Sequence, residues 1–292
     1  MNNPSSGKKI DDALPVRVYK RQNKAHIFEM LREMLTDLWA SHFLAYQFAK
    51  RDISSQYRQS YLGILWLFLT PVASAMVWIF LNSSGTINIP DTGMPYPVYV
   101  FSGTLIWSIL IDAINSPTQS TNASRSILTK INFPKEALVL SGVYKLLFNS
   151  SVKVVLLVAF VFIFGVGFHW SLLLFPLALV CTVLVGTAIG LLLTPTGLLY
   201  NDISRLVSMG LSLVMYLTPV VYGIPKTGIM KIIMTYNPFT PLVTTTRDLA
   251  VGQSPEFLNY FYGLSIAGIL LLLLSLLIYR VSIPVIVERL SA

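Results

Sequence analysis

Long apolar runs joined by short polar connections dominate the chain. Six runs have the length, roughly 20 apolar residues, that an α-helix needs to cross a hydrocarbon core of about 30 Å. They cover residues 62–82, 97–117, 139–166, 170–194, 205–223 and 257–280. The pattern predicts an all-α polytopic membrane protein in which residues 62–280 form a transmembrane domain of six helices.

A different pattern precedes the first run. In residues 26–48, apolar side chains recur at helical spacing on one face, and charged side chains fall on the other. The apolar face holds Ile27, Leu31, Met34, Leu35, Leu38 and Ala45, and the polar face holds Glu29, Arg32, Glu33, Thr36 and Asp37. This predicts an amphipathic helix lying in the membrane interface. The alternative, a surface helix packed on a soluble domain, has no such domain to pack against.

The segments around these runs complete the predicted organisation. Residues 26–61 are assigned to the interfacial helix and a short gate-like helix after it. Residues 1–25 are predicted to be a disordered cytoplasmic tail, and residues 281–292 a second cytoplasmic tail.

Residues 224–256 contain two short apolar helices, at about 228–236 and 240–250, on either side of Asn237-Pro238. Proline lacks the helix donor and disfavours helix at the residue before it, so a break is expected there. Neither helix is long enough to span a bilayer. We predict an outer re-entrant helical hairpin between the fifth and sixth spans, with a simple folded outer loop as the alternative.

Charge gives the orientation. Only 12% of the 292 residues are charged, against about 25% in soluble domains, and the net charge is +8. Ten of the 21 Lys and Arg residues precede residue 61, next to the first span. The positive-inside rule therefore predicts that both termini are cytoplasmic. A basic excess also suits nucleic acid, but beside membrane spans it indicates a membrane surface, and no nucleic-acid partner is expected.

Catalytic and cofactor motifs are missing from the sequence. It has no GxxxxGK[ST] loop, so we expect no nucleotide site in this chain. Cys181 is the only cysteine, the three histidines lack metal-ligand spacing, and the one adjacent acidic pair, Asp11-Asp12, lies in the predicted tail. No metal site or cofactor is expected, and the chain is predicted to be a transport component. The alternative is an integral membrane glycosyl- or phosphotransferase.

Four segments, in order along the chain, resemble the membrane permease of ATP-binding-cassette exporters of polysaccharides. They are RDISSQYRQSYLGILWLFLTP at 51–71, KINFPKEALVLS at 130–141, YLTPVVYG at 216–223 and YNPFTPLVTTTRDL at 236–249. The chain departs from the pattern in a longer segment before the first motif, and in YNDISR at 200–205, where many members have Arg-Asp.

The resemblance implies a homodimer that works with two copies of a separate ATPase, which holds the ATP and magnesium. ATP binding there would drive an undecaprenyl-diphosphate-linked glycan, of the O-antigen or lipopolysaccharide type, across the bacterial inner membrane. Permeases for a teichoic acid precursor, a drug or another lipid are the alternatives within transport.

Three sets of residues are candidates for this work. Lys50, Arg51, Tyr57, Arg58 and Tyr61 are predicted to meet the substrate headgroup. Arg51 and Arg58 are seven residues apart and would share a helix face, and guanidinium groups bind phosphate oxygens bidentately. The alternative is that these cations only anchor the chain to anionic lipid headgroups.

The second set is the inner loop 122–136, predicted to dock on the ATPase. Its residues are Arg125, Ile127, Leu128, Lys130 and Phe133. Ser124 or Ser126 is expected to cap a short helix there, and Phe133-Pro134 to end it. An ordinary turn with anchoring cations is the alternative.

The third set is assigned to the channel and outer gate. It consists of Trp107, Lys153, Tyr216, Tyr222, Tyr236, Phe239 and Arg247. The aromatic members either belong to the interfacial aromatic belt or stack under sugar rings. Lys153 either snorkels to the inner interface or faces the channel, and Asp112 is a possible partner for it or for Lys145.

Overall fold

The computed structural model describes residues 27–58, 60–86, 92–128, 130–131 and 133–291, and the predicted tail 1–25 lies outside them. Every element in these residues is a helix. They are α1 (Ile27–Ala40), α2 (His42–Arg58), α3 (Trp66–Ser83), α4 (Tyr96–Ala123), α5 (Arg125–Leu128), α6 (Glu136–Ile163), α7 (Phe175–Leu199), α8 (Asn201–Tyr216), α9 (Ile229–Tyr236), α10 (Phe239–Val251) and α11 (Leu258–Ser291), with short 3₁₀ turns at Gly63–Leu65 and Trp170–Leu173. The prediction of an all-α membrane protein is confirmed at this level.

Five of the helices are long and apolar enough to cross a membrane. They are α4, α6, α7, α11 and the continuous stretch Gly63–Ser83 that contains α3. The predicted fifth span, 205–223, corresponds to α8, which has 16 residues and ends at Tyr216, with turns after it.

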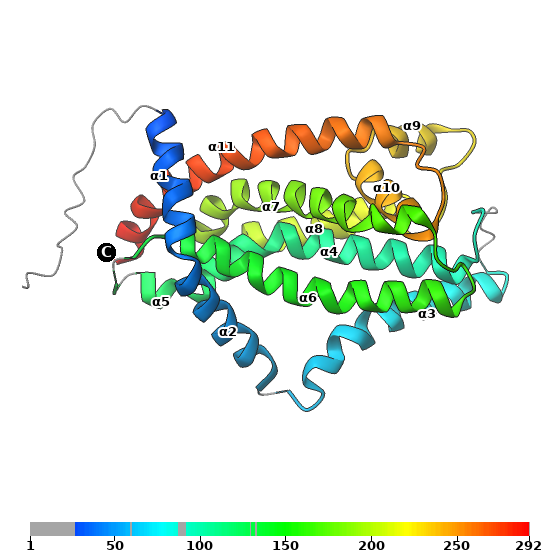
Figure 1. The fold of residues 1–292 in the computed structure, drawn as a ribbon, viewed down its shortest axis with the longest axis horizontal. Helices are drawn as coiled ribbons and strands as arrows, with labels where there is room; N and C mark the ends of the chain where they lie inside the picture. The colour runs from blue at the N-terminus through cyan, green and yellow to red at the C-terminus, as the bar shows by residue number, and fades with distance from the viewer. Residues whose placement is uncertain (1–26, 59, 87–91, 129, 132, 292) are drawn as a thin grey trace, which may run out of the picture.

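Two boundaries differ from the expectation. The amphipathic segment predicted as one helix over 26–48 is broken at Ser41, where α1 ends and α2 begins in a new direction (Figure 1). At the other end of the chain, the segment predicted as a tail, 281–292, continues α11 as far as Ser291.

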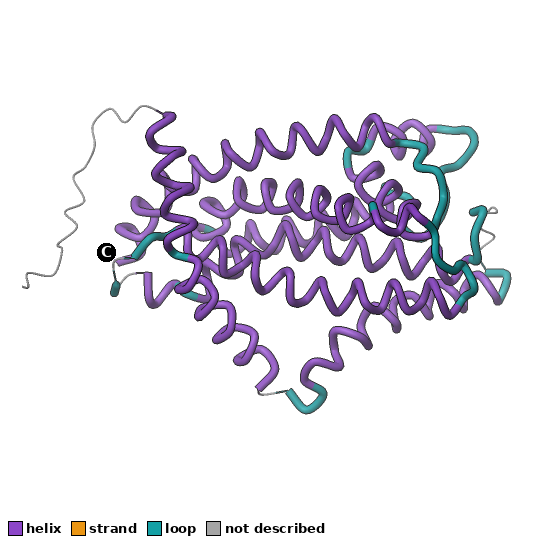
Figure 2. The backbone as a smooth tube through the Cα atoms, viewed as in Figure 1, coloured by secondary structure: helices purple, strands orange, loops and turns teal. Residues whose placement is uncertain are grey.

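The helices form an elongated bundle with α4 in its interior. α4 contacts α3, α6, α7, α8 and α10, and α11 packs along α7 (Figure 1). α5 and the chain's end lie at one end of the bundle, which we call the inner end. α9 and α10 lie at the opposite, outer end, and the loops gather at this end in Figure 2. α2 and α3 diverge from the bundle. The C-terminal end of α2 and the N-terminal end of α3 stand away from it, opposite the middle of α6 (Figure 1).

α4 comes very close to its neighbours at glycines. A Cβ at Gly190 of α7 would lie 2.1 Å from the carbonyl oxygen of Ile114, and a Cβ at Gly103 of α4 would lie 2.1 Å from that of Val220. Apolar side chains gain little by leaving lipid for protein, so close backbone approach at small residues is a main source of packing energy in a membrane. These glycines therefore determine how tightly α4 packs.

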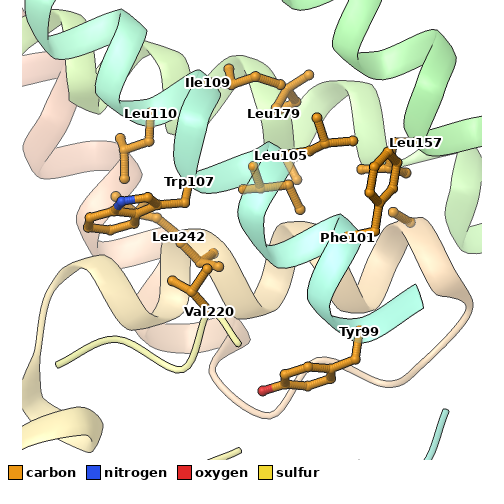
Figure 3. Close-up of a cluster of buried hydrophobic side chains, with 14 of the residues drawn as sticks. Tyr99, Phe101, Leu105, Trp107, Ile109, Leu110, Leu157, Leu179, Val220 and Leu242 are labelled. Atoms are coloured by element: carbon orange, nitrogen blue, oxygen red, sulfur yellow. The ribbon is translucent and has the colours of Figure 1, made fainter. Parts of the chain in front are cut away.

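The apolar core fills the space beside these contacts. Figure 3 shows side chains from α4, α6, α7 and α10 converging with Val220, which follows α8. Phe101 of α4 stacks on Phe160 of α6 with ring centroids 4.1 Å apart. A second apolar cluster, which includes Met34, Leu198 and Tyr279, packs α1, α7 and α11 together at the inner end.

An ionic clamp at the inner end holds α1. Arg280 of α11 lies 3.1 Å from Asp37 and 3.4 Å from Glu33, both on α1, and 3.0 Å from Glu136 at the start of α6. Glu136 is almost fully buried. One guanidinium group therefore joins three helices that are far apart in the sequence.

The glycine contacts predict a matched pair of substitutions. Gly190→Ala should lower the thermal unfolding midpoint of the detergent-purified protein, because its methyl group overlaps a backbone atom that cannot rotate away; overpacking of this kind costs about 1–3 kcal/mol. Gly210→Ala in α8 is the control, since a Cβ there meets no atom within 4 Å. Its midpoint should stay or rise, because alanine favours helix over glycine. Equal midpoints for the two variants would contradict the prediction.

Candidate functional site

A cleft of about 670 Å³ opens between the diverging helices α2 and α3 and the bundle. Its walls come from α2, α3, α4 and α6, with Met215 of α8 at one side. The residues that line it are Gln56, Tyr57, Trp66, Leu67, Thr70, Pro71, Ser74, Thr104, Trp107, Ser108, Ile111, Asp112, Ser116, Gln119, Lys145, Leu146, Asn149, Lys153 and Met215. The walls from α3, α4 and α6 belong to helices apolar enough to cross a membrane, yet many of the lining side chains are polar. Polar groups at such depth are costly and usually functional.

Lys153 and Asp112 form an ion pair in this cleft. The Lys153 ammonium lies 2.6 Å from the Asp112 carboxylate and donates a second hydrogen bond, also 2.6 Å, to the hydroxyl of Ser108. The lysine side chain is 7% exposed and the aspartate side chain 39% exposed. Of the partners considered for Asp112, the structure selects Lys153, and the ammonium points to α4 instead of toward the inner interface.

The other polar side chains of α6 lie on the same face. Lys145, Asn149 and Lys153 are spaced four residues apart, and all three line the cleft. The hydroxyl of Tyr57 on α2 donates to the Asn149 side-chain oxygen at 3.2 Å. Burial, and secondarily the charge of Asp112, raises the pKa of Tyr57, so this hydroxyl stays protonated. It ties the end of α2 to the middle of α6.

The predicted headgroup residues do not converge on one point. Tyr57 enters the cleft, whereas Lys50, Arg58 and Tyr61 are exposed. The side chains of Lys50 and Arg58 have no hydrogen-bond or ion-pair partner among the described residues.

Arg51 is engaged with the protein itself. Its guanidinium bonds to Asp52 at 2.7 Å and to the Ser124 hydroxyl at 3.1 Å, and it lies over the ring of Phe48. Arg51 therefore fixes α2 to the junction of α4 and α5.

The predicted docking loop contains a shorter helix than expected. α5 has four residues and ends at Leu128, well before Phe133-Pro134. Leu128 is 5% exposed, and Phe133 packs against Phe48 of α2 with ring centroids 5.6 Å apart. Ile127 and Arg125 are half-buried, and Lys130 is exposed. The outward-facing part of this loop is therefore centred on residues 130–131.

Beyond Tyr216 the chain is unwound, and side chains from elsewhere bind its carbonyl groups. Asn237 donates to the carbonyl of Leu217 at 2.9 Å, and Arg247 donates to that of Pro219 at 2.9 Å. Tyr96 donates to the Val221 carbonyl at 3.1 Å and Tyr99 to the Tyr222 carbonyl at 3.0 Å. These four donations supply the hydrogen bonds that a helix would otherwise have supplied.

Arg247 has a structural role in this outer region. It is 4% exposed, lies 3.8 Å above the centre of the Tyr99 ring and comes within 3.8 Å of Asp248. Burial raises the pKa of Asp248 to about 6; the charge of Arg247 opposes the shift and that of Glu256 adds to it.

The remaining residues predicted for the channel and outer gate lie in different parts of the structure. Trp107 lines the cleft and meets Phe239 edge-on at 5.8 Å. Tyr236 and Tyr216 are exposed at the outer end, and the Tyr222 hydroxyl donates to the Tyr216 carbonyl. Only Trp107 and Lys153 from this set line the cleft.

Most of the residues that line the cleft are not predicted from the sequence. Gln56, Ser108 and Asn149 line it and were not assigned to a site. A signal was present on α6, because Lys145, Asn149 and Lys153 recur at helical spacing inside an apolar run, which marks a face turned away from lipid. Nothing in the sequence indicated that α2 would return to this face.

Comparison with known proteins identifies relatives over most of the chain. A family model described as ABC-2 type transporter matches residues 44–250. An "O-antigen export system permease protein RfbA" of Klebsiella pneumoniae is 27% identical over 238 residues, which are 79% of this chain and 88% of that protein. A protein of the same name from Myxococcus xanthus is 26% identical over 220 residues, 74% of this chain and 83% of that protein.

The raised pKa of Asp248 predicts a pH-dependent stability. An unfolded aspartate titrates near 3.9, so the folded state binds the proton more tightly and stability falls as pH rises from about 4 to about 6. Asp248→Asn removes the buried charge. The gain in thermal midpoint of this variant over the unsubstituted protein should therefore be larger at pH 8 than at pH 5. Glu29→Gln, at an exposed carboxylate of α1, should show no such difference. A gain that is equal at both pH values would contradict the prediction.

Proposed function

The chain belongs to the ABC-2 type transporter family, and on that premise we propose that it is the membrane-spanning permease subunit of an ATP-driven exporter of O-antigen-type polysaccharide. The observation that carries the proposal is the polar cleft, 670 Å³ in volume, in the middle of helices that are otherwise suited to lipid. The relatives are named as O-antigen export permeases, and this supports the substrate class. The substrate we propose is a glycan linked to undecaprenyl diphosphate.

The proposed entry path is the gap between α2 and α3 that the cleft occupies. Exposed Trp66 and Leu69 on α3 suit the lipid tail, and the polar walls of α4 and α6 suit the glycan. Lys50 and Arg58, exposed and unpaired in the described part of the chain, are the headgroup cations we favour over Arg51, which is bound to Asp52 and Ser124. Tyr57 and Tyr61 complete the headgroup region in this proposal.

The proposed topology has six crossings. α8 with the unwound residues 217–223 makes the fifth, since the four donated hydrogen bonds let non-helical backbone exist at membrane depth. α9 and α10 form the re-entrant outer hairpin, and α1 lies in the inner interface. Both termini are cytoplasmic, and the membrane is the bacterial inner membrane.

The proposed energy source is a separate ATPase that docks at the inner end. An ABC-2 permease implies such a partner. We propose two copies of each subunit, with ATP and magnesium held by the ATPase and no cofactor in this chain. The residues we favour for docking are those around Lys130 and exposed Ile131, beside α5.

Two alternatives are distinguished by the cargo and the chemistry. The first alternative is a transporter with another cargo, namely a teichoic acid precursor, a drug or another lipid. The second alternative is a membrane glycosyl- or phosphotransferase, which would give a covalently changed product without ATP.

The exporter proposal predicts stimulated ATP hydrolysis. In liposomes, lipid-linked O-antigen should raise the ATPase rate of the purified complex, and Lys50→Gln/Arg58→Gln should need about tenfold more substrate for the same effect. Two lost hydrogen bonds to a charged group, at roughly 1.5–3 kcal/mol each, are sufficient for this. Lys231→Gln, an exposed cation at the outer end, is the control. An unchanged response in the double variant would contradict the headgroup assignment, and no stimulation at all would contradict the exporter.

The docking proposal predicts position-specific crosslinking. A photoreactive residue at Ile131, which is 60% exposed, should capture the ATPase, whereas one at buried Leu128 should capture little. Ile232 on α9 is the matched control, because it is 59% exposed at the opposite end of the bundle. Capture from Ile232 as efficient as from Ile131, or none from Ile131, would contradict docking at this loop.

A further inference from the structure

The two members of the ion pair in the cleft differ in how far their side chains are exposed. The Asp112 side chain is 39% exposed and the Lys153 side chain 7% exposed, although the two charged groups are 2.6 Å apart. The ammonium also donates to Ser108 on α4, which turns it further into the wall. A molecule in the cleft at this level therefore meets a carboxylate, with the balancing cation behind it.

Apart from the two lysines of α6, the other side chains that line the cleft are uncharged. Ser116 and Gln119 follow Asp112 toward the inner end on α4, Thr104 precedes it, and Asn149 lines the same cleft from α6. Trp66 and Trp107 add aromatic walls. Hydroxyl and amide groups exchange hydrogen bonds with sugar hydroxyls, and a carboxylate accepts the strongest of these bonds because it is charged.

A diphosphate meets the opposite situation. Asp112 faces its charge, and the Lys153 ammonium, 2.6 Å from the carboxylate, is already balanced, so this level of the cleft offers the diphosphate no net attraction. Lys145, two helical turns nearer the inner end than Lys153, has no hydrogen-bond or ion-pair partner among the residues described. The two lysines are eight residues apart, about 12 Å along the helix.

We infer that the Asp112–Lys153 pair makes the middle of the cleft a binding subsite for uncharged sugars, which holds the diphosphate back at the level of Lys145. The inference rests on the proposed export of a diphosphate-linked glycan and assigns the two parts of that substrate to two levels of one cleft. A pair that served only to join α4 to α6 would do so equally well with its charges exchanged. The subsite requires the carboxylate on the cleft side.

The test measures binding of a short-chain prenyl diphosphate without sugar to the complex with its ATPase in nanodiscs. Asp112→Asn leaves the ammonium uncompensated and should tighten binding about tenfold. Asp112→Asn/Lys153→Gln removes both charges and should return the affinity to within about threefold of the unsubstituted complex. Glu256→Gln, an exposed outer carboxylate, should change nothing.

The exchanged pair Asp112→Lys/Lys153→Asp keeps the attraction and places the cation on the cleft side. It should also bind the diphosphate more tightly and export the lipid-linked glycan more slowly, because the headgroup is trapped. This variant keeps the test decisive where Asp112→Asn fails to fold.

Unchanged diphosphate affinity in both Asp112→Asn and the exchanged pair would overturn the subsite while leaving the exporter standing. Tight binding that persists in the doubly neutral variant would overturn it as well. If lipid-linked glycan does not stimulate the unsubstituted complex, the proposed function fails, and the inference fails with it.

Discussion

The structure depends on how closely α4 can approach the helices around it. In a bilayer the apolar side chains are as well solvated by lipid as by protein, so association relies on contact at short range. Gly190 and Gly103 bring backbones together at distances that no other side chain allows. With α4 held in this way, its opposite face is free to carry Asp112 and Ser108 into a cleft.

The same constraint explains where polar groups are found. Each one inside the bundle must find a partner within the protein, because lipid offers none. The unwound residues after α8 meet this requirement through Asn237, Arg247 and two tyrosines, and Lys153 meets it through Asp112 and Ser108. Within the described residues, the unwound segment and the Lys153 ammonium are thus both satisfied by side chains from other helices.

The sequence predicted the features that depend on local periodicity. The apolar runs correspond to α3, α4, α6, α7 and α11, and the break at Asn237-Pro238 separates α9 from α10 as expected. The sequence did not predict the features that depend on contacts between distant residues. Arg247 reads as a charged outer residue in isolation, whereas in the fold it is buried against the unwound carbonyl of Pro219 and the ring of Tyr99. In the same way, a docking role for Leu128 followed from its position in a basic loop, but its neighbours bury it.

The clamp formed by Arg280 has a mechanical consequence. Because one guanidinium group binds α1, the first turn of α6 and α11 at once, these three helices are coupled at the inner end independently of the cleft. A force applied where α6 begins is passed directly to α1, and α2 continues from α1 after a single residue. Any rotation at the base of α6 that kept these ion pairs intact would therefore also have to move α1, and α2 with it.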